Sequence, residues 1–378
     1  MNHSPVAPAG TPLCLPHFGR TLCFRITETD DGCPAGKFLR GQGFSHRLLA
    51  RLKRTPGVIL LNQSSIPAGL PLHTGDELQV TIPYDFHRYR YFEDEMHPER
   101  QLESLPLPEI VFEDEDILVV SKPAGMPTHP SQGHHGDTLA EICALLLARR
   151  PDWASAIEEL RSECPSSADV HSASITPAAP SASGTDRAVS SSGSICAAPE
   201  HGEVILPALY CIGRLDRDTS GLLVLGKHAH SAGILSAAMK QRKIHRFYQA
   251  VVHGRLTEAG TVEAPIAREP GSVIKRQVHF SDGEAAITHY HPLAYHSTTD
   301  RTLVELKLET GRTHQIRVHM AWLGHPLVGD DLYGGAFVPA PGRQGQHLHS
   351  CSLSFVHPLT GQALSFCAPL PEDMKAAP

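Results

Sequence analysis

The sequence predicts an α+β fold. Its apolar runs are short, and strand-like and helix-like segments alternate without the regular strand–helix–strand order of a doubly wound parallel sheet. The 378 residues are 41% hydrophobic, which is typical of a globular chain. This length predicts roughly two or three domains, so we expect more than one folded unit.

Charge and cysteine usage narrow the class of protein. The formal net charge of −7 does not by itself indicate a nucleic-acid binder, so local basic patches must decide where phosphate docks. The nine cysteines contain no C-x-x-C pair, and the N-terminus lacks a basic start followed by an apolar core. No apolar run reaches membrane-spanning length. We expect a monomer in the reducing cytoplasm, with no signal peptide and no membrane partner.

Composition also predicts where the domains begin and end. Residues 1–19 are rich in Pro and Gly and are expected to form a flexible tail. Residues 85–107 mix both charges and are expected to be a linker. The main domain is expected over 108–372, interrupted at about 162–200 by a Ser-, Ala- and Pro-rich insertion that is too polar to fold.

Residues 20–84 are predicted to form a small separate module. A basic helix pair at 37–54 follows a first strand, and a second strand ends at Asn62. A Gly75-Asp76 turn then precedes a return strand. This order resembles the alpha-L RNA-binding module of a small-subunit ribosomal protein, which implies RNA binding; a solvated basic helix face is the alternative. The basic residues of the helix pair are Arg40, Arg47, Arg51, Lys53 and Arg54.

The segment 213–221, GRLDRDTSG, is the strongest candidate for a functional loop. Asp216 lies between Arg214 and Arg217, and these opposite charges favour its ionised form. The apolar run that follows predicts a buried strand, so the carboxylate is placed on a loop at the edge of the core. Taken alone, a segment of this kind is more often a structural Arg–Asp pair, because ion-pair networks also perturb carboxylates.

Two later segments also carry candidate functional residues. A predicted helix at 229–243 ends in basic residues, and the strand after it contains Tyr248. The segment 310–330, TGRTHQIRVHMAWLGHPLVGD, contains Arg317. Thr313 is expected to cap a helix in this segment. The apolar residues expected to face the core from that helix are Ile316 and Met320.

In this order, the three segments resemble the RluA/RluD-type family of RNA pseudouridine synthases, over most of 108–370 apart from the insertion. The loop at 121–131, SKPAGMPTHPS, is a fourth similar segment. The resemblance implies the pseudouridine-synthase fold, with a central and mostly antiparallel sheet. It also implies isomerisation of uridine to pseudouridine in structured RNA, with no cofactor and no metal. Large-subunit (23S) rRNA is the favoured substrate, and tRNA is the alternative.

The resemblance also implies roles for individual residues. Asp216 corresponds to the catalytic aspartate, and Arg317 to the arginine that pairs with it. Tyr248 corresponds to the tyrosine that packs on the target base or acts as the base. An aromatic face would recover part of the cost of extruding a uridine from paired RNA. The residues expected to bind substrate or RNA are Arg214, Arg217, Lys240, Arg242, Lys243, Arg312, His314, Arg47 and Arg51.

Three positions depart from the family pattern. Gly213 occupies the position before Arg-Leu-Asp, where the family usually has His. Arg246 replaces the Lys of Lys-x-Tyr, and Ser121 replaces the Asn that usually precedes Lys-Pro-Ala-Gly. None of these changes touches Asp216 or Tyr248.

Other classes of protein have weaker support. The histidines lack the H-E-x-x-H frame of a metalloenzyme, and no G-x-x-x-x-G-K-[ST] loop indicates a nucleotide-dependent enzyme. A non-catalytic RNA-binding assembly factor with the same fold is the remaining alternative.

Overall fold

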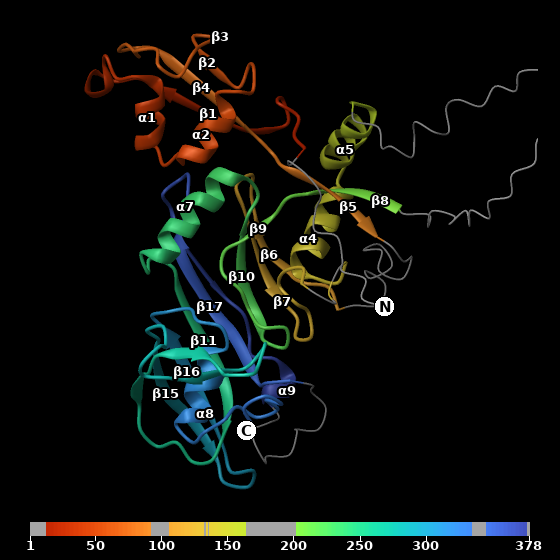
Figure 1. The fold of residues 1–378 in the computed structure, drawn as a ribbon, viewed down its shortest axis with the longest axis vertical. Helices are drawn as coiled ribbons and strands as arrows, with labels where there is room; N and C mark the ends of the chain where they lie inside the picture. The colour runs from red at the N-terminus through yellow and green to blue at the C-terminus, as the bar shows by residue number, and fades with distance from the viewer. Residues whose placement is uncertain are drawn as a thin grey trace, which may run out of the picture.

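A computed structural model shows an α+β body with a small N-terminal unit packed at one end (Figure 1). Within the described residues, no helix has both the length and the apolar character needed to cross a membrane. The described residues are 13–91, 106–131, 134, 136–163, 202–334 and 345–375.

The body is built on one ten-stranded sheet. Its neighbouring strands pair antiparallel, except that β10 and β17 pair parallel. The predicted mostly antiparallel central sheet is therefore confirmed. The strands run in the order β12 (Gly260–Glu263), β15 (Ile287–His296), β16 (Arg301–Leu308), β11 (His245–His253), β17 (Leu348–Val356), β10 (Ser220–Gly226), β7 (Ile117–Lys122) and β6 (Glu109–Glu113), with β18 (Ala363–Cys367) on β17 and β9 (Tyr210–Cys211) on β10.

Strand β10 separates two apolar cores, which is why it is buried along its whole length. Successive strand residues point to opposite faces. Leu223 and Leu225 join the core under α4 (Leu139–Ala148), whereas Leu222 and Val224 join the core under α7 (Ala229–Lys240). The loop that carries Asp216 is thus anchored to the best-buried strand of the sheet.

The N-terminal unit has its own apolar core and its own four-stranded sheet. Ser45, a residue type that favours this position, caps the second helix by accepting the backbone N–H of Leu48. The side chain of Asn62 donates to Asp76 and accepts the backbone N–H of Glu77, which ties the two turns together. The elements are β1 (Gly19–Arg25), the 3-10 helix η1 (Glu28–Asp30), α1 (Ala35–Gly41), α2 (His46–Leu52), β2 (Ile59–Leu61), β3 (Ser64–Ser65) and β4 (Glu77–Pro83).

The predicted tail is wrong for residues 13–19. Leu13 pairs with Phe86 through backbone hydrogen bonds, and Leu15 is fully buried. Phe18 packs edge-on against Trp153, with ring centroids 5.1 Å apart. The Pro-rich composition concealed three apolar residues whose partners lie far away in the sequence. Residues 1–12 of the predicted tail lie outside the described residues.

The predicted linker is also wrong where the structure describes it. Strand β5 (Phe86–Tyr91) pairs antiparallel with β8 (Gly202–Pro207), so the segment on the far side of the insertion completes a ribbon. Helix α5 (Pro151–Glu163) extends into the first residues assigned to the insertion. Non-local pairing of this kind leaves no local signal in the sequence. Residues 92–105 and 164–201 lie outside the described residues.

Several short elements of the body were not predicted. The predicted helix of segment 310–330 is α8 (Gln315–Trp322). A two-stranded hairpin, β13 (Ile266–Arg268) and β14 (Arg276–Val278), packs on α8 through the small core formed by Ile266, Ala286 and Val318. The other unpredicted element is the terminal helix α9 (Glu372–Lys375).

Candidate active site

The loop that carries Asp216 is held on both sides by the 121–131 segment. Thr128 Oγ1 donates to the carbonyl of Leu215 at 2.7 Å and accepts its N–H at 3.2 Å. The buried ammonium of Lys122 donates to the carbonyl of Arg217 at 2.7 Å and to that of Met126. These hydrogen bonds hold the backbone on both sides of Asp216, so the carboxylate is positioned before any substrate arrives.

Asp216 and Arg317 are in contact, as the sequence predicts. Arg317 Nη1 donates to Asp216 Oδ2 at 3.2 Å. The other edge of the guanidinium forms a bidentate pair with Asp330, at 2.7 and 2.8 Å. Burial opposes the charge on Arg317, but the hydrogen bonds and charge of Asp330, reinforced by Asp216, raise its pKa above the usual value. Arg317 therefore stays cationic and holds Asp216 from one side.

His314 and Tyr333 complete the surroundings of the carboxylate. The Tyr333 hydroxyl accepts the backbone N–H of Arg276 and lies 2.9 Å from His314 Nδ1, so its own proton is free to point to that nitrogen. The Nε2 proton of His314 then faces Asp216 Oδ2, 3.8 Å away. Burial is the main cause that lowers the pKa of His314. A neutral imidazole is thus placed beside Asp216.

The start of α8 differs from the prediction. His314, and not Thr313, is the N-cap residue, and it has a left-handed backbone with φ of 59°. No side chain caps this end of the helix. Ile316 and Met320 are buried in the core, as predicted. A left-handed conformation is rare for a residue with a side chain and marks a strained, often functional position.

Asp216 and Tyr248 open onto the same cavity of about 610 Å³. Tyr248 lies on β11, is only 4% exposed, and lines this cavity from the core side. This volume lies within the usual range for sites that hold a small molecule or a nucleotide. The basic side chains of the cavity wall are Arg214, Lys240, Arg242, Arg246 and Arg312.

The remaining residues predicted to bind RNA differ in whether they are exposed or paired with an acidic side chain. Arg217 pairs with its neighbour Asp218, whereas Lys243 and Arg47 are exposed. Arg51 corrects the prediction, because it binds the buried carboxylate of Asp85 and ties the N-terminal unit to the body. Two of the cavity residues also have acidic partners: Arg242 pairs with Glu309, and Arg312 with Glu284.

Four residues that support the site were not predicted from the sequence. Lys122, Thr128, Asp330 and Tyr333 each contact the loop, the arginine or the histidine described above. Lys122 and Thr128 lie in segment 121–131, Asp330 ends segment 310–330, and Tyr333 lies three residues beyond it. Their types alone gave no signal, because each acts through a contact with a residue distant in sequence.

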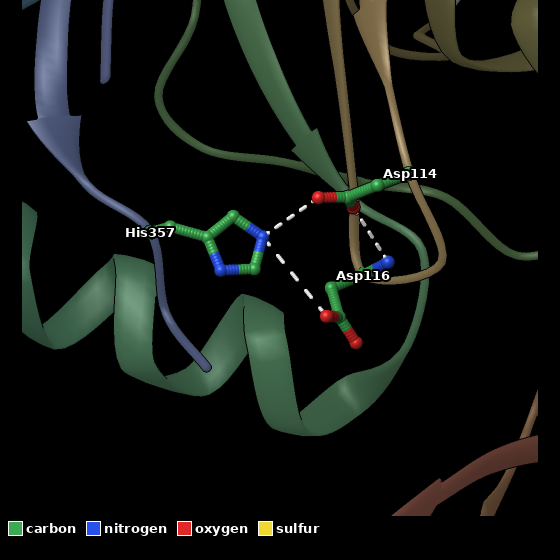
Figure 2. A group of neighbouring side chains, drawn as sticks. All are labelled: Asp114, Asp116 and His357. Atoms are coloured by element: carbon green, nitrogen blue, oxygen red, sulfur yellow. Dashed lines mark hydrogen bonds and ion pairs between the residues drawn. The ribbon is translucent and has the colours of Figure 1, made fainter. Parts of the chain in front are cut away.

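One group of side chains in the described part of the chain has donor atoms close enough to hold a metal: Asp114, Asp116 and His357 (Figure 2). Their hydrogen bonds do not suit a cation. His357 Nδ1 accepts the backbone N–H groups of residues 359 and 360, so the ring proton lies on Nε2, which is 2.9 Å from Asp114 Oδ2. Asp116 is bound by Arg20 at 2.9 Å and by His228 at 3.0 Å.

This group instead joins distant parts of the fold. Arg20 comes from the N-terminal unit, and His228 is the N-cap of α7. Burial opposes the charge on Asp116, but the hydrogen bonds and charges of His228 and Arg20 outweigh it and lower the pKa of Asp116.

An acid-sensitive contribution to stability is therefore expected from Asp116. Because its pKa is lowered in the folded state, its contribution is present above the ordinary carboxyl pKa and is lost as the pH falls through the folded value. Asp116→Asn should destabilise the protein by about 3 kcal/mol near neutral pH, and the difference should shrink in acid. Urea unfolding at several pH values measures this. A pH-independent difference would contradict it.

Comparisons with known proteins agree on one class of enzyme. The family model described as RNA pseudouridylate synthase matches residues 198–322, the segment that contains Asp216, Tyr248 and Arg317. The uncharacterized RNA pseudouridine synthase YjbO of Bacillus subtilis is 36% identical over 335 residues, which cover 88% of this chain and 93% of that protein. The ribosomal large subunit pseudouridine synthase D of Xanthomonas campestris pv. campestris is 32% identical over 343 residues, covering 88% and 83%.

Among solved structures, the human RNA pseudouridylate synthase domain containing 4 is 21% identical, with a TM-score of 0.46 over 71% of this chain and 91% of that one. The sequence relatives carry the assignment. The chain belongs to the RNA pseudouridine synthases, in the RluA/RluD-type family. It is an enzyme, an isomerase that forms pseudouridine.

Proposed function

We propose that Asp216 is the catalytic carboxylate of this pseudouridine synthase. The observation that carries the proposal is the pairing of Asp216 with the buried Arg317 at the wall of a cavity shared with Tyr248. In the reaction the bond from the sugar to N1 breaks, the uracil turns, and a bond to C5 forms. The proton lost from C5 balances the one gained at N1.

An ionised carboxylate can assist this reaction in two ways. It can attack the anomeric carbon, or it can accept the proton of the neighbouring sugar carbon. The contact with Arg317 places a positive charge beside the Asp216 carboxylate for either step, and the fixed loop backbone keeps the carboxylate in place. The Tyr248 ring offers a stacking face to an extruded uracil, an interaction worth about 1–3 kcal/mol.

Large-subunit rRNA is the proposed substrate. Four relatives at 32–35% identity are named as ribosomal large subunit pseudouridine synthase D, and this name supports the choice. The test is to map pseudouridines in the rRNA and tRNA of cells that make either the wild-type chain or the Asp216→Asn chain. We expect one or more rRNA sites to disappear with the variant. Identical maps would reject the assignment of Asp216, and loss confined to tRNA would reject the rRNA substrate.

The N-terminal unit is proposed to be an alpha-L type RNA-binding module. Arg40 and Arg47 lie exposed on α1 and α2, where phosphate could reach them. Each phosphate contact contributes about 0.7–0.9 to the slope of log K against log salt. The double variant Arg40→Gln with Arg47→Gln should therefore lower that slope by roughly 1–2.

Filter binding of unmodified large-subunit rRNA across a salt series measures this slope. Arg255→Gln, which removes an exposed arginine that stacks on Tyr295, is the control and should leave the slope unchanged. An equal slope for the double variant and the wild type would make the basic face a solvated surface.

A further inference from the structure

Arg246 lies beside the proposed catalytic carboxylate. It stands two residues before Tyr248 on β11, so both side chains leave the strand on the same face. Both line the cavity that contains Asp216. The guanidinium lies between two glycines: a Cβ at Gly311 would be 3.3 Å from Nη2, and a Cβ at Gly213 would be 3.6 Å from Nη1. The absence of side chains at these two positions makes room for its planar group.

Arg246 has no anionic partner among the residues that the structure describes. Its Nε is buried and has no hydrogen-bond partner. The cavity wall contains two carboxylates, and both are engaged elsewhere. Asp216 is bound by Arg317, and Glu309 is bound by Arg242 at 2.8 Å and by His289 at 2.7 Å. An Nε–H group left in this state has lost hydration without a compensating hydrogen bond, which is unfavourable.

We propose that Arg246 binds a phosphate of the RNA backbone at the target uridine, an inference that rests on the proposed function of this cavity. The ligand is expected to be an anion because the unpaired group is a cation, and because Arg214 and Lys240 add positive charge to the same wall. A phosphodiester presents two oxygens whose spacing matches the two N–H donors along one edge of a guanidinium. The contact would satisfy Arg246 and fix the sugar in front of Asp216.

The shape of this site favours arginine over lysine. The space between Gly213 and Gly311 accommodates a flat group that can donate from two edges. A lysine ammonium would supply the charge but only as a point, without bidentate geometry. Arg246→Lys should therefore retain part of the phosphate binding, and Arg246→Gln should lose it.

The test compares uridine 5′-monophosphate with uridine as ligands of the full-length protein, by calorimetry or NMR titration. The wild type should bind the monophosphate tighter by about tenfold, as expected for a charge-assisted contact. Arg246→Gln should remove this preference, and Arg246→Lys should keep part of it. Arg255→Gln is the control and should behave as the wild type does.

Two outcomes would overturn the proposal: equal binding of the two ligands by the wild type, or a preference that survives in Arg246→Gln. This binding test is independent of turnover. A wild-type enzyme that prefers the monophosphate but forms no pseudouridine in rRNA would reject the proposed substrate alone. An active enzyme without the preference would reject the phosphate site alone.

Discussion

Asp216→Asn should abolish pseudouridine formation while leaving the fold intact. The variant removes the charge that either proposed step requires, so we expect the rate of modification to fall by at least about 10³-fold. An Asn oxygen can still accept from Arg317 Nη1, and the bidentate pair of Arg317 with Asp330 is untouched. Release of tritium from C5 of [5-³H]uridine-labelled rRNA measures the rate.

The control for this variant is its stability. The loop around Asp216 is fixed by backbone contacts to Thr128 and Lys122, and these do not involve the carboxylate. The thermal unfolding midpoint should therefore stay close to that of the wild type. An active Asp216→Asn enzyme would show that another group supplies the chemistry. A variant that is inactive because it is unfolded would leave the midpoint far below the wild-type value.

The sequence was sufficient to predict the parts of the fold whose signals are local. The apolar run after Asp216 is strand β10, and Ser45 caps α2 as its type suggests. The sequence could not predict the pairing of β5 with β8, because the two strands lie far apart in the chain and no local pattern links them. The burial of Leu15 also depends on distant partners, so the Pro-rich composition around it indicated a tail.

The same distinction holds for the candidate site. The contact between Asp216 and Arg317 was predicted from a resemblance that linked two separated motifs. The second carboxylate, Asp330, ends the segment 310–330, and nothing in its sequence position predicts a role for it. Only the fold shows that Asp330 takes two of the donors of Arg317. Arg51 shows the opposite error: a basic helix residue that looked available for RNA pairs with the buried carboxylate of Asp85.

Asp330→Asn should have the largest effect on stability among the variants considered. The side chain of Asp330 is fully buried and holds Arg317 by two donors, and it also accepts the backbone N–H groups of Leu332 and Tyr333. An asparagine would turn one N–H toward a guanidinium that only donates. Breaking a buried ion pair costs about 3–5 kcal/mol, which lowers the Tm by roughly 6–12 °C.

Activity should fall with stability, because Arg317 would no longer be held in position beside Asp216. At a temperature where the variant remains folded, kcat should drop more than KM rises. The lost contact holds Arg317 beside the proposed catalytic Asp216 and does not bind the RNA. Asp331→Asn is the matched control: its side chain is 71% exposed and lies 3.8 Å from Arg317, so its stability should stay within about 0.5 kcal/mol of the wild type. Equal Tm values for the two variants would show that Arg317 does not depend on Asp330. A change confined to KM would assign Asp330 to RNA binding instead of the alignment of Arg317.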